Sequence, residues 1–140
     1  MTFVELMIAM SIVLLIGTIC FPKYSIEKYH INSFTKQLCS DIRYVRRSNM
    51  LGDGSVYILW TFSSGYNGYV LKNNKKNIKE ISIPSNIKIN PSIIRVKFRT
   101  DGSLEERGGK IKIFGKKVYK EITIVPISGR TLLKEGKYEV

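Results

Sequence analysis

The sequence predicts an α+β fold in which a long amino-terminal α-helix packs on a small antiparallel β-sheet head. Three observations lead to this prediction. An apolar stretch opens the chain, a stretch with helical amphipathic spacing follows it, and short runs with strand-like alternation occupy the remainder. We therefore divide the chain into residues 1–24, the apolar half of the helix, residues 25–52, its amphipathic stem, and residues 53–140, the β head.

The opening stretch from Leu6 to Phe21 is apolar apart from one serine, one glycine and one threonine. Together with residues 1–4 it reaches about the 20 residues that cross a bilayer. This predicts a membrane helix. A secretory signal peptide fits poorly, because basic residues do not precede the stretch and small residues do not end it.

The distribution of basic residues bears on topology. Every lysine and arginine lies at or after Lys23, so the positive-inside tendency alone would place the head in the cytoplasm. The head could instead lie outside the cytoplasm if a basic leader preceded Met1 and was removed, because long domains translocate largely regardless of their charge. Under this interpretation Met1 is a processed amino terminus.

Glu5 is the one charged residue before Lys23, and a carboxylate in hydrocarbon is costly. One explanation is a capping box, in which Thr2 is the N-cap and the Glu5 side chain accepts a hydrogen bond from the Thr2 backbone N–H. That explains the helix start, but intramembrane carboxylates usually have a charged partner. The other explanation is an ion pair with the free ammonium of Met1 on a neighbouring subunit, which would set the stagger between packed helices.

The stem repeats apolar residues at intervals of three and four, which predicts one face packed on a sheet. Pro22 is expected to bend the helix or to remove one of its hydrogen bonds. The glycines of MLGDGS (50–55) are expected to end it, so one helix is predicted from about residue 2 to about residue 50. The apolar stripe is Ile31, Phe34, Leu38, Ile42 and Val45, and the basic residues largely off it are Lys28, Lys36, Arg43, Arg46 and Arg47.

The head is predicted to be one antiparallel sheet of five to seven strands. Alternation of apolar and basic residues is clearest at 95–98 and 110–113, where one face is expected to be buried. We expect Trp60, Phe62, Tyr69 and Phe98 to be core aromatics. The predicted strands are 56–62, 68–72, 78–83, 93–99, 110–114 and 118–125, separated by glycine-rich or asparagine-rich turns.

The stem and head carry the positive charge of the chain, since all Lys and Arg lie at or after Lys23; the whole chain has 23 Lys and Arg against 11 Asp and Glu and a net charge of +12. Such an excess favours nucleic acid, anionic lipid or another acidic neighbour, and it is equally compatible with a solvated face that keeps the protein soluble. The residues predicted to contact DNA phosphates are Lys112, Lys116, Lys117, Arg130, Lys134 and Lys137.

Catalytic and metal-binding patterns are missing from the sequence. His30 is the only histidine, and it has no cysteine or histidine companions at metal-ligand spacing. Cys20 and Cys39 would lie roughly 28 Å apart on one helix, too far to form a disulfide. Glycine-rich phosphate loops and G-x-S-x-G are not found either. We therefore expect no enzymatic activity, no cofactor, no metal site and no small-molecule substrate.

The opening reads Met-Thr-Phe-Val-Glu-Leu-Met-Ile, and Pro22 and Tyr24 follow the apolar stretch. Over these 24 residues the chain resembles the type IV pilin and pseudopilin superfamily, in the offsets of charge, proline and aromatic ring. The resemblance implies a pilin fold, cleavage before Met1 by a prepilin peptidase and N-methylation of Met1. It also implies filament assembly with other pilin or pseudopilin subunits through Glu5, with Thr2 and Pro22 as parts of the same assembly helix.

The second half resembles the minor pilins of the GspH/FimT type. The shared motifs are F-x-x-x-G (98–102), a G-G pair (108–109) and S-G-R (128–130), after which a short strand is implied. In some members a second arginine after the G-R pair is implicated in DNA contact, and here Leu132 stands at that place.

The two resemblances together imply a minor subunit of a type IV pilus or of a competence pseudopilus for DNA uptake. Such a subunit is first a single-pass cytoplasmic membrane protein with its head outside the cytoplasm, and then part of a filament at the cell surface. One alternative is a purely structural or assembly-initiating subunit of a pilus or type II secretion-like pseudopilus that binds no nucleic acid. The other is a single-pass membrane protein that is never processed.

Overall fold

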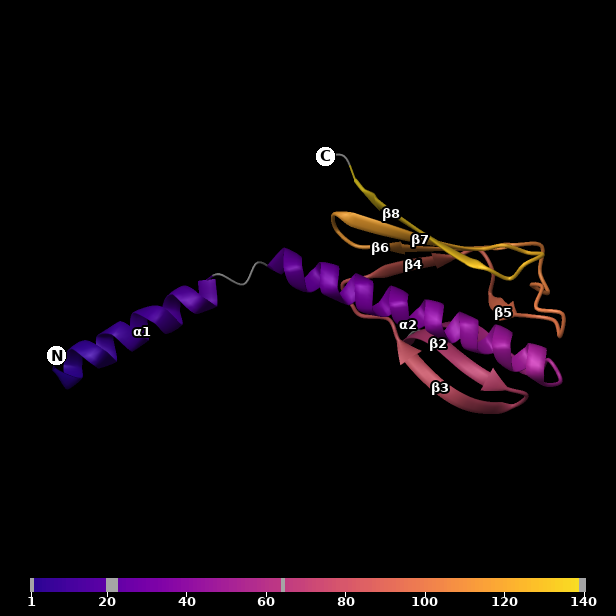
Figure 1. The fold of residues 1–140 in the computed structure, drawn as a ribbon, viewed down its shortest axis with the longest axis horizontal. Coiled ribbons are helices and arrows are strands. Elements are labelled where there is room, and N and C mark those ends of the chain that lie inside the picture. Colours follow the sequence, from indigo (N-terminus) through magenta and orange to yellow (C-terminus); the bar gives the residue numbers. More distant parts are fainter. Residues whose placement is uncertain (1, 20–22, 64, 139–140) are drawn as a thin grey trace.

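Over residues 2–19, 23–63 and 65–138, which the computed structural model describes, the chain forms two helices and eight strands (Figure 1). The predicted α+β class is therefore confirmed. The helices are α1 (Phe3–Ile19) and α2 (Lys23–Leu51). The strands are β1 (Val56–Ser63), β2 (Tyr66–Asn73), β3 (Lys76–Ser82), β4 (Lys88–Pro91), β5 (Arg95–Lys97), β6 (Gly109–Phe114), β7 (Val118–Ile124) and β8 (Thr131–Lys137).

The prediction of a single sheet of five to seven strands is wrong. The strands form two four-stranded antiparallel sheets, in the orders β3-β2-β1-β5 and β4-β6-β7-β8. The segment from β3 to β6 alternates between them, because β4 pairs with β6 while β5 returns to pair with β1. The short strand β4 was not predicted at all, and β8 lies where the resemblance to minor pilins implies a strand.

The predicted continuous helix is confirmed only in part. The structure has α1 and α2 as separate elements, and residues 20–22, which include Pro22, lie outside the described residues. Within the described part of the chain, neither helix combines the length and the apolar character that a membrane crossing requires.

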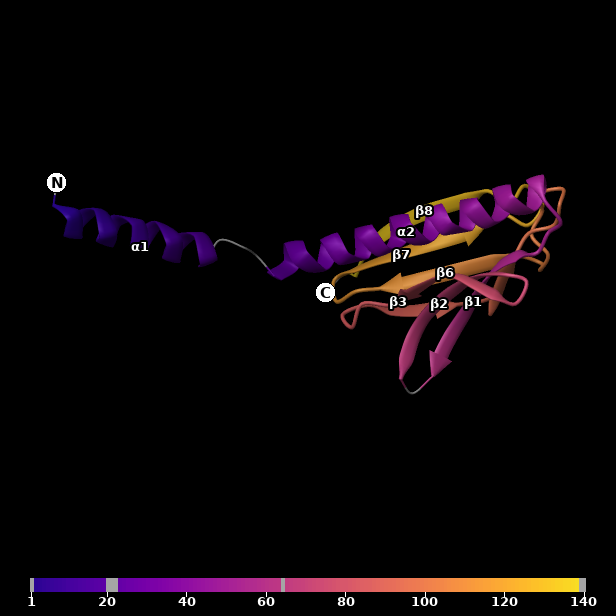
Figure 2. The same cartoon turned by 90° about the horizontal axis from the view of Figure 1, so that it is seen from below.

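The core forms where α2 crosses both sheets. All five residues of the predicted stripe are buried, and α2 contacts β1 and β5 of the first sheet and β7 and β8 of the second (Figure 2). The core cluster runs from Ile31 to Ile124, whereas α1 has no buried residue. The chain from residue 26 onward therefore contains the whole described core.

The aromatic predictions are confirmed for Trp60, Tyr69 and Phe98, which are buried, and wrong for Phe62, which is 55% exposed. Phe62 shares a face of β1 with Trp60 and stacks on it, with ring centroids 6.2 Å apart and planes 4° apart. The reason for its exposure is its position, since the β1–β2 hairpin extends away from α2 toward its tip (Figure 2).

Asn49 fastens the carboxyl-terminal end of α2 to the first sheet. Its side-chain amide donates to the carbonyl oxygens of Val56 and Phe98, both at 2.8 Å, and its Oδ1 accepts from the Val56 N–H at 3.0 Å. The side chain is fully buried, so these three bonds satisfy polar groups that water does not reach. These bonds hold the carboxyl-terminal end of α2 in place against the first sheet.

Candidate functional site

The amino-terminal helix begins with the capping box that the sequence predicts. The Glu5 carboxylate accepts from the Thr2 backbone N–H at 2.8 Å, and the Thr2 hydroxyl accepts from the Glu5 N–H at 3.3 Å. Two of the N–H groups that have no partner within the helix are satisfied in this way. Met1, assigned to cleavage and N-methylation, and Pro22, assigned to assembly, lie outside the described residues.

The side chains of α1 are exposed on every face of the helix. Thr18 and Ser11 turn their hydroxyls onto backbone carbonyl oxygens of the preceding turn, at 2.7 and 2.8 Å, which removes their need for water. An all-round apolar helix has no partner in a single copy of the chain, so its apolar surface is available for lipid or for other helices.

The six basic residues predicted to contact DNA do not form one surface. Arg130 lies in the β7–β8 connection, beside the carboxyl-terminal part of α2. Lys116 and Lys117 lie in the β6–β7 turn, which is held at the opposite end of α2 because the Glu27 carboxylate accepts from the Lys116 N–H. Lys137 belongs to this second group, since it pairs with Val118.

Lys112 and Lys134 form a third group, on the outer face of the second sheet. Both are cross-strand partners of Glu121 in the register of β6, β7 and β8, so their side chains share its face. Glu121 also forms an ion pair with Lys110 at 3.9 Å. This face therefore has mixed charge, which makes it a weaker site for a polyanion than its lysines alone suggest.

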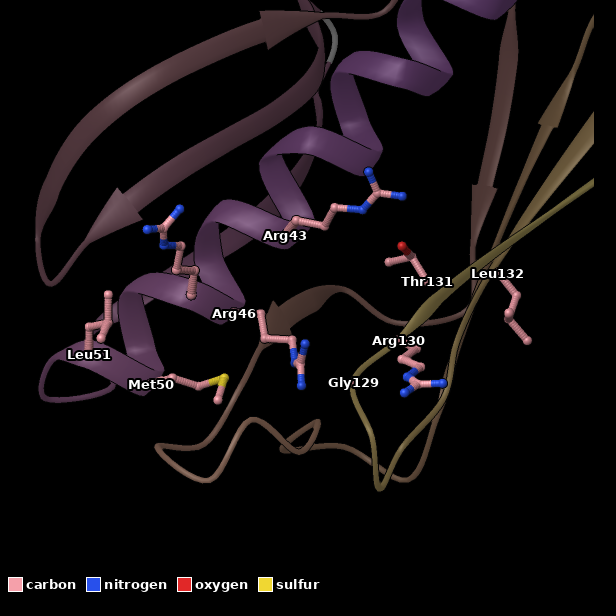
Figure 3. Close-up of a pocket in the computed structure, with 9 residues that line it drawn as sticks. Arg43, Arg46, Met50, Leu51, Gly129, Arg130, Thr131 and Leu132 are labelled. Atoms are coloured by element: carbon pink, nitrogen blue, oxygen red, sulfur yellow. The ribbon is translucent and has the colours of Figure 1, made fainter.

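A basic groove lies between the carboxyl-terminal part of α2 and the start of β8, and sequence reasoning did not find it. Its volume is about 660 Å³, and Figure 3 shows Arg43 and Arg46 extending from α2 toward the segment 129–131. We define the arginine groove by Arg43, Arg46, Arg47 and Arg130; its other lining residues are Met50, Leu51, Gly129, Thr131 and Leu132.

Two glycines from the motifs singled out in the sequence lie close together at the arginine groove, where Gly129 is one of the lining residues. Gly102 and Gly129 have φ of 82° and 60°, and a Cβ on Gly129 would lie 2.2 Å from the Gly102 carbonyl oxygen. The same oxygen accepts a hydrogen bond from Arg46 Nε at 3.2 Å. The F-x-x-x-G and S-G-R motifs therefore meet over one arginine of α2.

The turn that carries Gly102 is held by its own polar groups. The Arg99 N–H donates to the Ser103 carbonyl oxygen at 2.8 Å, and Asp101 Oδ1 accepts from the Ser103 hydroxyl at 2.6 Å and N–H at 2.8 Å. These hydrogen bonds, first that of the hydroxyl, lower the pKa of Asp101 below its ordinary value. Residues 100–103 (TDGS) therefore form a tight turn.

The electrostatics of the arginine groove favour an anion. Arg43, Arg47 and Arg130 are exposed and Arg46 is half-buried, and the described residues that line the groove include no carboxylate. Asp41, which precedes Arg46 on α2, is directed to the first sheet instead. Its carboxylate accepts from the Tyr69 hydroxyl at 2.7 Å and pairs with Lys79 at 3.1 Å.

A signal for part of this site was present in the sequence. Arg43, Arg46 and Arg47 are spaced by three and four residues, so they share one face of a helix. The sequence alone indicates only the polar side of the stem, because their neighbour Arg130 lies more than 80 residues away in the chain. Among the described residues, no group of three or more His, Cys, Asp or Glu side chains is placed to hold a metal ion.

Comparisons with protein-family models, with curated proteins and with solved structures find no match to this chain.

Proposed function

We propose that this chain is a minor pilin or pseudopilin. In this proposal a prepilin peptidase removes a leader, Met1 is methylated, and residues 1–24 anchor the chain in the cytoplasmic membrane with the head outside the cytoplasm. The chain then joins other subunits in a type IV pilus or DNA-uptake pseudopilus at the cell surface. The observation that carries the proposal is Glu5 at the head of an apolar helix that buries none of its side chains.

The role of Glu5 can be separated from local capping. Glutamine also completes a capping box, so Glu5→Gln keeps the hydrogen bond to the Thr2 N–H and removes only the charge. We expect Glu5→Gln to fold normally but to enter filaments poorly, because the ammonium of a neighbouring Met1 loses its counter-ion. Thr2→Ala is the matched control, since it weakens the cap and keeps the carboxylate. Normal incorporation of Glu5→Gln, or equal defects in both variants, would reject the inter-subunit pair.

Processing is tested by mass spectrometry of the native amino terminus. A methylated Met1 is the expected result, because methylation of this residue requires prior cleavage of a leader. An uncleaved leader would instead support the alternative of a single-pass membrane protein that is never processed.

We further propose that the arginine groove contacts the phosphate backbone of DNA. Four guanidinium groups around an open groove match a chain of phosphates, and such contacts give affinity without reading sequence. The expected affinity for duplex DNA is in the micromolar range at low salt, as for other non-specific contacts.

The test compares two double variants that remove the same charge. Arg43→Ala with Arg130→Ala should weaken DNA binding in a gel shift. It should also reduce, by about 2, the steepness with which the logarithm of the binding constant falls with the logarithm of the salt concentration. Lys112→Ala with Lys134→Ala, on the mixed-charge face, should change binding less. Equal effects of the two pairs would reject the groove as the site, and no shift by the unaltered protein at low salt would reject DNA binding.

The second candidate function is a structural or assembly-initiating subunit without nucleic-acid contact. The exposed apolar surface of α1 favours assembly whether or not the head binds DNA. A deletion strain separates the two candidates. Loss of DNA uptake with normal filament numbers supports DNA contact, whereas loss of filaments alone supports the structural role.

A further inference from the structure

One end of the head carries a group of lysines that the arginine groove does not use. Lys28 lies near the start of α2, Lys116 and Lys117 lie in the β6–β7 turn, and Lys137 ends β8. All four are exposed. We call this group the basic collar, and Figure 1 shows that its three elements gather where α2 begins.

The fold holds the basic collar in a defined place. The Glu27 carboxylate accepts from the Lys116 N–H, and a Cβ on Gly115 would lie 2.3 Å from Ile31 Cδ1, so the turn closely approaches α2. The end of β8 is fixed to the same turn, because the Tyr138 N–H donates to the Lys117 carbonyl oxygen at 3.3 Å.

The basic collar carries a net positive charge. Two described carboxylates, Glu27 and Glu135, lie at this end, so the four lysines outnumber them. Glu27 accepts from a backbone N–H, and Glu135 pairs with Lys120 at 3.3 Å. Exposed tyrosines accompany the lysines, with Tyr29 on α2 70% exposed and Tyr138 after β8 41% exposed. Lysine and tyrosine together are typical of surfaces at the boundary between a bilayer and water.

The position of α1 in the chain determines which surface the collar end of the head faces. The helix α1 directly precedes α2, so any surface that α1 enters lies at the collar end of the head. The arginine groove is far away, since the 19 residues from Glu27 to Arg46 span roughly 28 Å of helix. The collar and the groove are therefore separate basic surfaces at opposite ends of α2.

We propose that the basic collar binds the anionic lipid headgroups of the membrane in which α1 is anchored. This binding holds the head against the bilayer surface before assembly. This inference rests on the proposed membrane anchoring of residues 1–24. A lysine near an anionic surface gains about a fivefold preference for it, and the gain decreases with salt as the Debye length shortens.

The test is lysine footprinting of the full chain in nanodiscs. The chain is placed in discs of phosphatidylcholine alone or of phosphatidylcholine with phosphatidylglycerol, and acylation of each lysine is followed by mass spectrometry. We expect Lys28, Lys116 and Lys137 to react up to about fivefold more slowly in the anionic discs, and the difference to vanish near 1 M salt. Lys75, exposed in the β2–β3 turn away from the collar, serves as the internal control.

Two double variants with the same change in charge provide a further test. Lys116→Gln with Lys137→Gln should remove most of the salt-sensitive protection of Lys28, whereas Lys75→Gln with Lys76→Gln, the same charge change elsewhere, should leave it. Equal acylation of the collar in both kinds of disc would overturn the proposal. Protection of the collar by added duplex DNA, without protection by anionic discs, would overturn it as well. Failure of the chain to enter either disc is a different result, because it contradicts the proposed membrane anchoring itself.

Discussion

Replacement of Gly129 by alanine tests the geometry that builds the arginine groove. At φ 60° the backbone of Gly129 is left-handed, which costs an alanine about 1–2 kcal/mol. The new methyl group would also lie 2.2 Å from the Gly102 carbonyl oxygen and 2.8 Å from Arg46 Nε. Overpacking of this kind costs about 1–3 kcal/mol, so the free energy of unfolding should fall by about 2–5 kcal/mol in total.

The assay is urea unfolding of residues 26–140, followed by the fluorescence of Trp60, the only tryptophan. With a slope of about 1–3 kcal/mol per molar urea, the midpoint should fall by about 1 M or more. Two further variants provide a graded comparison. Gly102→Ala should cost less than Gly129→Ala, because the nearest atom to its new methyl is the flexible Met50 sulfur at 2.9 Å.

Gly65→Ala is the matched control, because nothing lies within 4 Å of its Cβ position. Its cost should stay within about 0.5 kcal/mol. If Gly129→Ala were as mild as Gly65→Ala, the 98–102 and 128–130 motifs would not be in contact, and the geometry described for Gly129 at the arginine groove would be wrong.

Three further predictions concern single side chains. Asn49→Ala should lower the free energy of unfolding by about 3–5 kcal/mol in the same assay, because it leaves buried backbone groups of two strands unpaired; a loss below 1 kcal/mol would contradict the three hydrogen bonds. Ser103→Ala should raise the pKa of Asp101 toward its ordinary value in a carboxyl NMR titration, because the hydroxyl that lowers it is gone. The lowered pKa means that Asp101 stabilises the fold at neutral pH and loses this contribution as the pH falls through its folded pKa, and Ser103→Ala should weaken that acid dependence. Burial raises the pKa of the Cys39 thiol, partly offset by Arg43 and Lys120, so Cys39 should react with a thiol reagent near pH 8 far more slowly in the folded protein than in urea, and equal rates would contradict its burial.

Three features of the fold could be predicted from the sequence because their causes are local. The stripe of the stem, the capping box of Thr2 and Glu5 and the alternation at 110–113 all depend on residues within a few positions of one another. A periodicity of 3.6 or of 2 residues expresses such short-range relations, and each of these predictions is confirmed.

The division into two sheets could not be predicted from the sequence, because it depends on pairing between strands that are far apart in the chain. The strand β5 pairs with β1, which lies far earlier in the chain, and the alternation of residues within a strand does not specify such a distant partner. Phe62 illustrates the same point, because its place in β1 predicts burial and only the reach of the hairpin beyond α2 exposes it.

The sequence by itself determined the helix start at Thr2 and Glu5, the buried face of α2 and the strongly basic character of the head. Tertiary structure alone decided how that basic charge is distributed. Packing brings Arg130 to three arginines of α2, and it carries Lys116 and Lys137 to the other end of the same helix. The physical reason is that charge is a property of composition, whereas a charged surface is formed by residues that chain folding brings together from distant positions.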